Sequence, residues 1–152
     1  MFCALNVPNS LAKTVLLAGT AVVVLLPKVA GGDERAAESW DHDWPAAWKQ
    51  SQASGRPILL FITSEHCYYC DKMNRETYRD DDVRDELDSR FVTVAIDSDD
   101  HPRLVRKLNI ETFPTTLIVG PDAYVIDTVT GYLSPQQMRS RLKRAGEKLA
   151  AN

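Results

Sequence analysis

Residues 58–72 read ILLFITSEHCYYCDK, and they carry the strongest structural signal in the chain. Its first part is a continuous apolar run, which is the pattern of a strand buried on both faces. Its second part holds Cys67 and Cys70 in C-x-x-C spacing, where we expect the strand to give way to a helix. A thiol at a helix N-terminus lies at the positive end of the helix dipole, which favours the nucleophilic thiolate. The spacing also lets two sulfurs join and separate with little backbone movement, so we expect a reversible dithiol switch.

Residue patterns on both sides of this stretch predict alternating helices and strands. Helices are expected at 43–54, from the cysteines to about 78, from 80, from 100 and at 134–149, and strands at 57–63, 91–96, 115–119 and 124–130. Turn-forming residues at 120–123 indicate that the last two strands form an antiparallel hairpin. Helix–strand units that end in a hairpin predict an α/β fold with a central mixed β-sheet of four to five strands and helices on both faces.

The composition is that of one globular domain. The chain has 152 residues, of which 44% are hydrophobic and 26% charged, and this is enough material for a single core. Its formal net charge is -3, and its basic residues are interspersed with acidic ones. These charges argue against nucleic acid as a partner. We expect a monomer.

The N-terminal segment predicts export. A short region with one lysine precedes the apolar stretch 14–26, and small residues follow it, which is the order of a secretory signal peptide at 1–31. The alternative is an uncleaved membrane anchor. The uncharged stretch between Lys13 and Lys28 is, however, shorter than the roughly 20 residues of a comfortable span. We therefore expect a periplasmic or otherwise extracytoplasmic protein.

Removal of the signal peptide would leave a domain with only two cysteines. The three cysteines of the chain are Cys3, Cys67 and Cys70, and Cys3 would leave with the signal. Palmitoylation of Cys3 in an anchored form is a minor alternative. We expect a linker at 32–42 and one folded domain at 43–150.

A second motif is Thr112-Phe113-Pro114-Thr115, in which a proline directly precedes a predicted strand. Because proline cannot donate to a sheet ladder, it is out of place in a central strand. A cis peptide bond between Phe113 and Pro114 would account for its presence.

The C-x-x-C pair at a helix start, the Thr-Phe-Pro-Thr motif and the element order together resemble the thioredoxin superfamily, over roughly residues 40–149. Within it, the chain looks most like small exported thioredoxin-like proteins in which a Trp-bearing helix and a Gly-Arg-Pro turn, here 55–57, lead into the first strand. The resemblance implies a thioredoxin-like fold and a thiol–disulfide oxidoreductase. It leaves open whether the protein reduces, oxidises or isomerises disulfides.

The resemblance also implies roles for single residues. Cys67 would be the attacking thiolate and Cys70 the resolving thiol, with the redox-active disulfide between them in place of a cofactor. Residues 112–114 would shape a groove for an extended substrate strand. Tyr68 and Tyr69 would form an exposed rim that contacts substrate, and because thioredoxins have Gly-Pro there, their redox potential cannot be transferred to this chain. The implied partners are protein dithiols or disulfides and an upstream redox partner that could be membrane-bound.

Two positions depart from thioredoxins. Their buried Asp, six positions before the first cysteine, is Phe61 in this chain, and their Lys in the next strand is Thr93. The proton relay to the resolving cysteine is therefore missing or rebuilt. Glu65 and His66 are candidates for tuning the pKa of the cysteines, although His66 can also be read as a plain surface residue.

Two other functions compete with redox catalysis. The first is a module that handles a soft metal such as Cu(I) or Zn, with Cys67, Cys70 and His66 as ligands, but a fourth ligand is absent and we expect no metal. The second is a non-catalytic binding module in which the cysteines form a static disulfide. Haem attachment is excluded, because Asp71 stands where that motif requires His.

Overall fold

The computed structural model describes residue 37 and residues 40–151. The predicted signal peptide at 1–31, most of the predicted linker and Cys3 lie outside the described residues and stay predictions. The described chain forms the helices and strands α1 (Trp44–Ser54), β1 (Ile58–Thr63), α2 (Tyr68–Glu76), α3 (Asp81–Arg90), β2 (Val92–Asp97), α4 (Pro102–Lys107), β3 (Thr115–Val119), β4 (Val125–Thr130) and α5 (Pro135–Ala150). None of the helices in this described part is long and apolar enough to cross a membrane.

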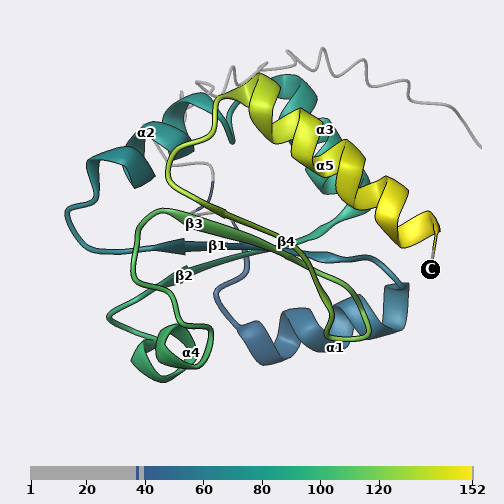
Figure 1. Cartoon of the computed structure of the whole chain (residues 1–152), viewed down its shortest axis with the longest axis horizontal. Coiled ribbons are helices and arrows are strands. Elements are labelled where there is room, and N and C mark those ends of the chain that lie inside the picture. Colours follow the sequence, from purple (N-terminus) through teal and green to yellow (C-terminus); the bar gives the residue numbers. More distant parts are fainter. Residues whose placement is uncertain (1–36, 38–39, 152) are drawn as a thin grey trace, which may run out of the picture. The chain divides into compact units, whose positions relative to one another are not determined.

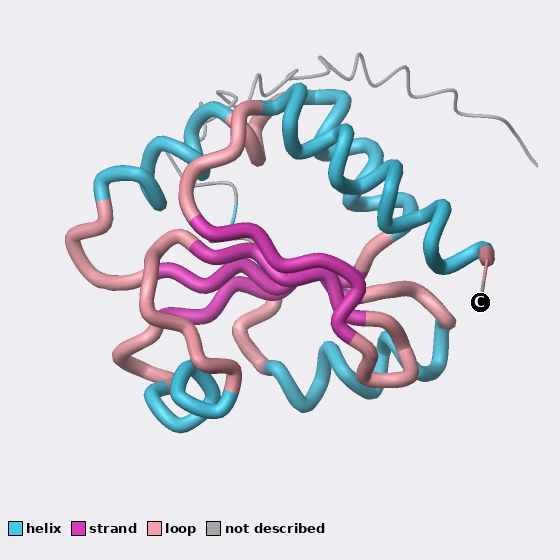
Figure 2. The backbone as a smooth tube through the Cα atoms, viewed as in Figure 1, coloured by secondary structure: helices cyan, strands magenta, loops and turns pink. Residues whose placement is uncertain are grey.

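The strands form one mixed sheet in the order β2-β1-β3-β4. β1 pairs in parallel with β2 and antiparallel with β3, and β3 and β4 form the antiparallel hairpin. Phe61, in the middle of β1, lies opposite Ala95 on one side and Thr116 on the other. The predicted α/β class with a mixed sheet of four to five strands is therefore confirmed with four strands (Figure 2).

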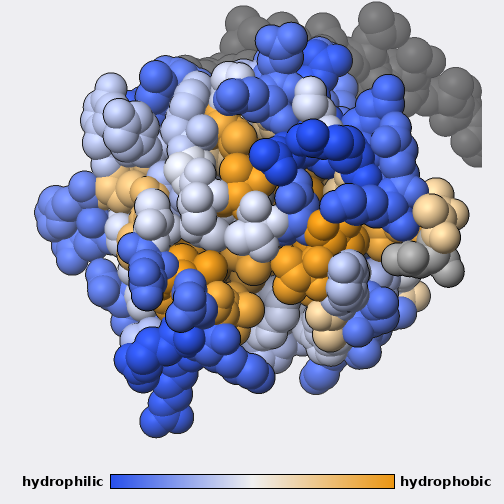
Figure 3. Space-filling model, viewed as in Figure 1, coloured by the Kyte–Doolittle hydropathy of each residue, from blue (hydrophilic) through white to orange (hydrophobic). Residues whose placement is uncertain are grey.

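Helices cover both faces of the sheet. Figure 1 shows α1 and α4 on one face and α2, α3 and α5 on the other. The side chains of β1 alternate between two core clusters, with Leu59 and Phe61 in the cluster under α2, α3 and α5 and Leu60 and Ile62 in the cluster under α1 and α4. Burial on both faces explains why β1 is apolar at every position from 58 to 62. Outside the core, the face drawn in Figure 3 is mainly hydrophilic, with apolar residues gathered near the middle of the view.

Side chains cap α1 and α5 at the predicted positions. Asp43 accepts a hydrogen bond from the Ala46 N–H at 3.2 Å and starts α1, which ends at Gly55 in the left-handed region with φ 71°. Ser134 and Gln137 form the reciprocal capping box of α5. The helix that carries the cysteines ends at Glu76, two residues before the prediction, and the side chains that follow it are buried.

Two residues of the predicted linker contact the domain. Asp41 forms an isolated parallel bridge to Val94. The ring of Trp40 lies 4.6 Å from that of Tyr78 and 6.5 Å from that of Phe61, both measured between centroids in edge-on geometry. Trp40 is therefore part of the packing around β1. The sequence does not indicate this, because the residues around Trp40 are polar and resemble a linker.

Candidate redox site

The cysteine pair lies at the start of α2, just after the turn that follows β1. β1 ends at Thr63, and after a short turn Cys67 takes the N-cap position of α2. Its Sγ accepts a hydrogen bond from the backbone N–H of Cys70 at 3.2 Å. A side chain that accepts such an N–H is the standard helix cap, and a thiolate accepts it more strongly than a thiol. Cys67 Sγ is thus the side-chain cap of α2, at the positive end of the helix dipole.

The two cysteines differ in burial. They are joined by a disulfide with 5.2 Å between their Cα atoms. Cys70 is 1% exposed and belongs to the core, whereas Cys67 is half-buried at its edge. Tyr68 and Tyr69 between them are 66% and 56% exposed. Cys67 is therefore the more exposed of the two cysteines, an asymmetry of the kind that sequential attack and resolution require.

The proline motif lies at the start of the neighbouring strand. The Phe113–Pro114 peptide bond is cis, and the carbonyl of Pro114 accepts a hydrogen bond from the Gly131 N–H at 2.7 Å. Thr112 is exposed, and Phe113 is half-buried against the same core cluster as Cys67. Residues 112–113 precede the first paired residue of β3, Thr115, so their backbone lies outside the sheet ladder.

The departures from thioredoxins are visible in the packing. Phe61 is fully buried, and its ring lies 5.0 Å from that of Tyr78, so an aromatic core fills the place of a buried carboxylate. Burial raises the pKa of the Tyr78 phenol far above its usual value of 10.0, and this hydroxyl stays protonated. Thr93 lies on β2 opposite Leu59 and is half-buried.

Glu65 and His66 lie in the turn before Cys67. Their side chains are 75% and 87% exposed, and His66 Nδ1 is 3.5 Å from the Glu65 carboxylate. His66 has a φ of 57°, which places the turn in the left-handed region immediately before the cap. The Glu65 and His66 side chains are therefore exposed to solvent in the turn that leads into Cys67.

A cavity of about 510 Å³ adjoins Cys67 on the β2 side of the site. Its wall includes Phe61, Asn74 and His101. Asn74 Oδ1 and His101 Nδ1 are buried and have no hydrogen-bond partner among the described residues. Sequence reasoning missed both, although Asn74 stands one helical turn after Cys70 and hence on the same side of α2.

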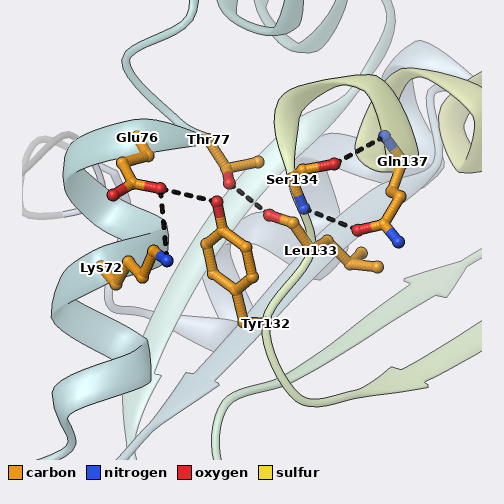
Figure 4. A network of polar contacts seen from close by, with 7 residues as sticks. All are labelled: Lys72, Glu76, Thr77, Tyr132, Leu133, Ser134 and Gln137. Carbon is orange, nitrogen blue, oxygen red and sulfur yellow. Dashed lines mark hydrogen bonds and ion pairs between the residues drawn. The ribbon is translucent and has the colours of Figure 1, made fainter.

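The far end of α2 is fixed to the loop before α5 (Figure 4). The Tyr132 hydroxyl donates a hydrogen bond to Glu76 Oε2 at 2.7 Å, and Lys72 Nζ lies 4.7 Å from the centre of the Tyr132 ring. Thr77 Oγ1 donates to the carbonyl of Leu133. Desolvation first, and then the Glu76 carboxylate, raise the pKa of the Tyr132 phenol, so it remains a donor at neutral pH. These contacts hold the cysteine-bearing helix in place.

The soft-metal alternative depends on a cluster of ligands. Within the part of the chain that the structure describes, no group of three or more His, Cys, Asp or Glu side chains is arranged to hold a metal ion. The two cysteine sulfurs that such a site would use are bonded to each other.

Comparisons with known proteins agree on one family. Residues 44–146 match the family described as the thioredoxin-like domain. The thiol:disulfide interchange protein DsbD of Yersinia pestis (strain Pestoides F) is 26% identical over 98 residues, which are 61% of this chain and 16% of that protein. The chain therefore spans only a small part of the length of this relative.

Solved structures give the same result. A thioredoxin from Thermus thermophilus superposes with a TM-score of 0.68 and 26% identity, over 74% of this chain and 90% of that one. The C-terminal domain of DsbD from Neisseria meningitidis, in its reduced form, has the same fold, with a TM-score of 0.59 and 17% identity over 66% of this chain and 92% of that one.

These comparisons and the geometry of the cysteine pair lead to the same assignment. The fold, the C-x-x-C pair at the helix start and the relatives support a thiol–disulfide oxidoreductase. The chain belongs to the thioredoxin-like domain family.

Proposed function

We propose that this protein is exported and exchanges disulfides with protein substrates through Cys67 and Cys70. The observation that carries the proposal is the placement of Cys67: it is half-buried, caps α2 through its own sulfur, and is bonded to a resolving cysteine that is 1% exposed. A disulfide kept only for stability needs neither an accessible sulfur nor a helix N-cap position.

In the reducing direction the reaction has two displacements. The Cys67 thiolate attacks one sulfur of a client disulfide, so a Cys67–client bond forms, the client S–S bond breaks, and the other client sulfur leaves as a thiolate. Cys70 then gives its proton to the client thiolate released in the first displacement and attacks Cys67 Sγ. The mixed disulfide breaks, and the second client sulfur leaves. Two electrons have passed to the client, whose thiolates take up two protons, and the pair ends as the Cys67–Cys70 disulfide.

Turnover requires a second redox partner. A partner dithiol must reduce the Cys67–Cys70 disulfide when the protein acts as a reductase, and an oxidised acceptor must remove electrons when the steps run in reverse. The relationship to DsbD supports partners of this thiol-redox class in general.

The substrate groove is proposed beside the proline motif. Thr112 and Phe113 lie next to the start of β3 but outside its ladder, which supports the proposal that their backbone pairs with an extended client strand. Pro114 fixes the course of the chain at this point, and the exposed rings of Tyr68 and Tyr69 would flank the client. Recognition of this type is mostly main-chain and therefore broad.

Export rests on the sequence of residues 1–31, whose apolar stretch and small-residue exit have the order of a signal peptide. Expression of the full chain in a bacterial host tests it. We expect the protein in the periplasmic fraction with a mass that lacks about the first 31 residues. A full-length mass in the cytoplasmic fraction contradicts export without touching the redox proposal.

The redox proposal is tested by two matched variants. Cys70→Ser removes the resolving thiol, so we expect mixed disulfides with clients to accumulate on Cys67, where non-reducing gels and mass spectrometry detect them. Cys67→Ser keeps an oxygen at the helix cap, and we expect it to fold but to reduce no insulin disulfides. Full turnover by Cys67→Ser would refute the mechanism.

A further inference from the structure

We propose that the cavity beside Cys67 is a specificity site that receives a basic side chain, arginine or lysine, from the client next to its reacting cysteine. The inference rests on the proposed function, because it assigns a use to the surface on which a client would lie during exchange.

The first observation is an unpaired acceptor. Asn74 is 6% exposed and is one of the residues that line the cavity, and its Oδ1 is buried with no hydrogen-bond partner among the described residues. A buried carbonyl oxygen without a donor is unfavourable, so such groups in proteins usually meet water or a ligand. An N–H donor that enters the cavity and reaches Asn74 Oδ1 would satisfy this acceptor.

The second observation is the charge of the wall. Four carboxylate side chains line the cavity, from Glu65, Asp71, Asp97 and Asp100, and among the described lining residues there is no lysine or arginine. Carboxylates accept hydrogen bonds and attract cations, and they repel an anionic client. The carboxylates of the cavity wall and Asn74 Oδ1 therefore both favour the same kind of partner, a positively charged group with several N–H donors.

The third observation is the reach from the reacting sulfur. Cys67 lines the same cavity, and Asn74 follows it by seven residues along α2, which is roughly 10 Å at 1.5 Å per residue. An extended client advances about 3.3 Å per residue. An arginine or lysine a few positions from the client cysteine can therefore reach the acceptor while the cysteine stays at Cys67.

The sheet order separates this site from the proposed main-chain groove. β1 lies between β2 and β3, with the proline motif at the start of β3 and Asp97 at the end of β2. The client would pair with residues 112–113 on one side of Cys67 and place its basic side chain on the other. The main-chain groove would then accept clients of any sequence, and the cavity would add a preference for clients with a basic side chain near the reacting cysteine.

The test uses disulfide-linked peptides that differ at one position, with Arg, Gln or Glu placed in turn at each of three positions on either side of the cysteine. The reduced full chain is mixed with each peptide, and the rate of exchange is followed by stopped flow. At low salt we expect the Arg peptide to react about 3–10 times faster than the Gln peptide at one or more positions, with Glu slowest. At high salt we expect this ratio to fall towards one.

Variants place the preference in the cavity. Asp100→Asn and Asn74→Leu should each lower the Arg-to-Gln rate ratio about two- to threefold. Asp99→Asn is the matched control: it removes the same charge from the same loop, but Asp99 does not line the cavity, so its ratio should stay near that of the wild type.

Equal rates for the Arg, Gln and Glu peptides at every position would overturn the inference, as would an Asp99→Asn effect as large as that of Asp100→Asn. Failure of the proposed function looks different, because then no peptide of the set forms a mixed disulfide at Cys67.

Discussion

The helix cap made by Cys67 can be separated from its chemistry with two substitutions. In Cys67→Ser a hydroxyl oxygen replaces the sulfur that accepts the Cys70 N–H at 3.2 Å, so the cap is kept. In Cys67→Ala the acceptor is lost. Both variants lack the nucleophile and should be equally inactive, but only the alanine variant should lose helix stability.

The expected difference follows from known cap energies. Replacing a serine N-cap by alanine costs about 1 kcal/mol of unfolding free energy, within a range of roughly 0.5–2. For a domain of this size that corresponds to a fall in Tm of about 3–6 °C. Denaturant unfolding of both variants, measured under reducing conditions to exclude disulfides, gives the difference directly from the midpoints at constant m value.

Ser134 provides the matched comparison, because it is the N-cap of α5 and lies in a capping box. Ser134→Ala should cost a similar amount, since it removes the same kind of hydrogen bond at a helix without cysteines. If Cys67→Ala and Cys67→Ser unfold within 0.3 kcal/mol or so of one another while Ser134→Ala is destabilised, the cap at Cys67 does not contribute as described.

Three further predictions concern the scaffold. Phe61→Ala removes a fully buried ring and should cost about 3–5 kcal/mol, measured by denaturant unfolding; a loss below about 1 kcal/mol would contradict the packing described. Tyr78 keeps its proton in the fold while the unfolded chain loses it above pH 10, so the unfolding free energy should fall by about 1.4 kcal/mol per pH unit from that pH upward, and Tyr78→Phe should flatten the slope. Gly55→Ala places a Cβ at φ 71° with no atom within 4 Å, so its expected cost of about 1 kcal/mol is backbone strain alone, and an unchanged Tm would count against it.

The sequence predicted the parts of the fold whose signals are local. A few neighbouring residues are enough to predict each of these parts. Examples are the apolar run 58–62, the cap residues Asp43 and Ser134, and the turn at 120–123. Their order was enough to give the sheet and its helices. The predicted end of α2 lies two residues past the observed one, because the chain there is held by the contact of Thr77 with Leu133, 56 positions further along the chain.

The candidate site was predictable only where a motif marked it. The C-x-x-C spacing singled out Cys67 and Cys70, and the proline motif singled out residues 112–114. The cavity was not predictable, because its wall joins the turn before α2, Asn74 within α2 and the loop after β2, which no sequence pattern connects. Asn74 carries no signal of its own, since an asparagine in a helix is ordinarily read as a surface residue.

The relative reactivity of the two thiols decides whether Cys67 is the attacking residue. The fully reduced protein is treated with a limiting amount of iodoacetamide at neutral pH, and peptide mapping counts the label on each cysteine. We expect Cys67 to be alkylated at least tenfold faster than Cys70, because its sulfur is accessible and capped by an N–H while Cys70 is 1% exposed. Equal labelling, or faster labelling of Cys70, would contradict the assignment of Cys67 as the attacking residue.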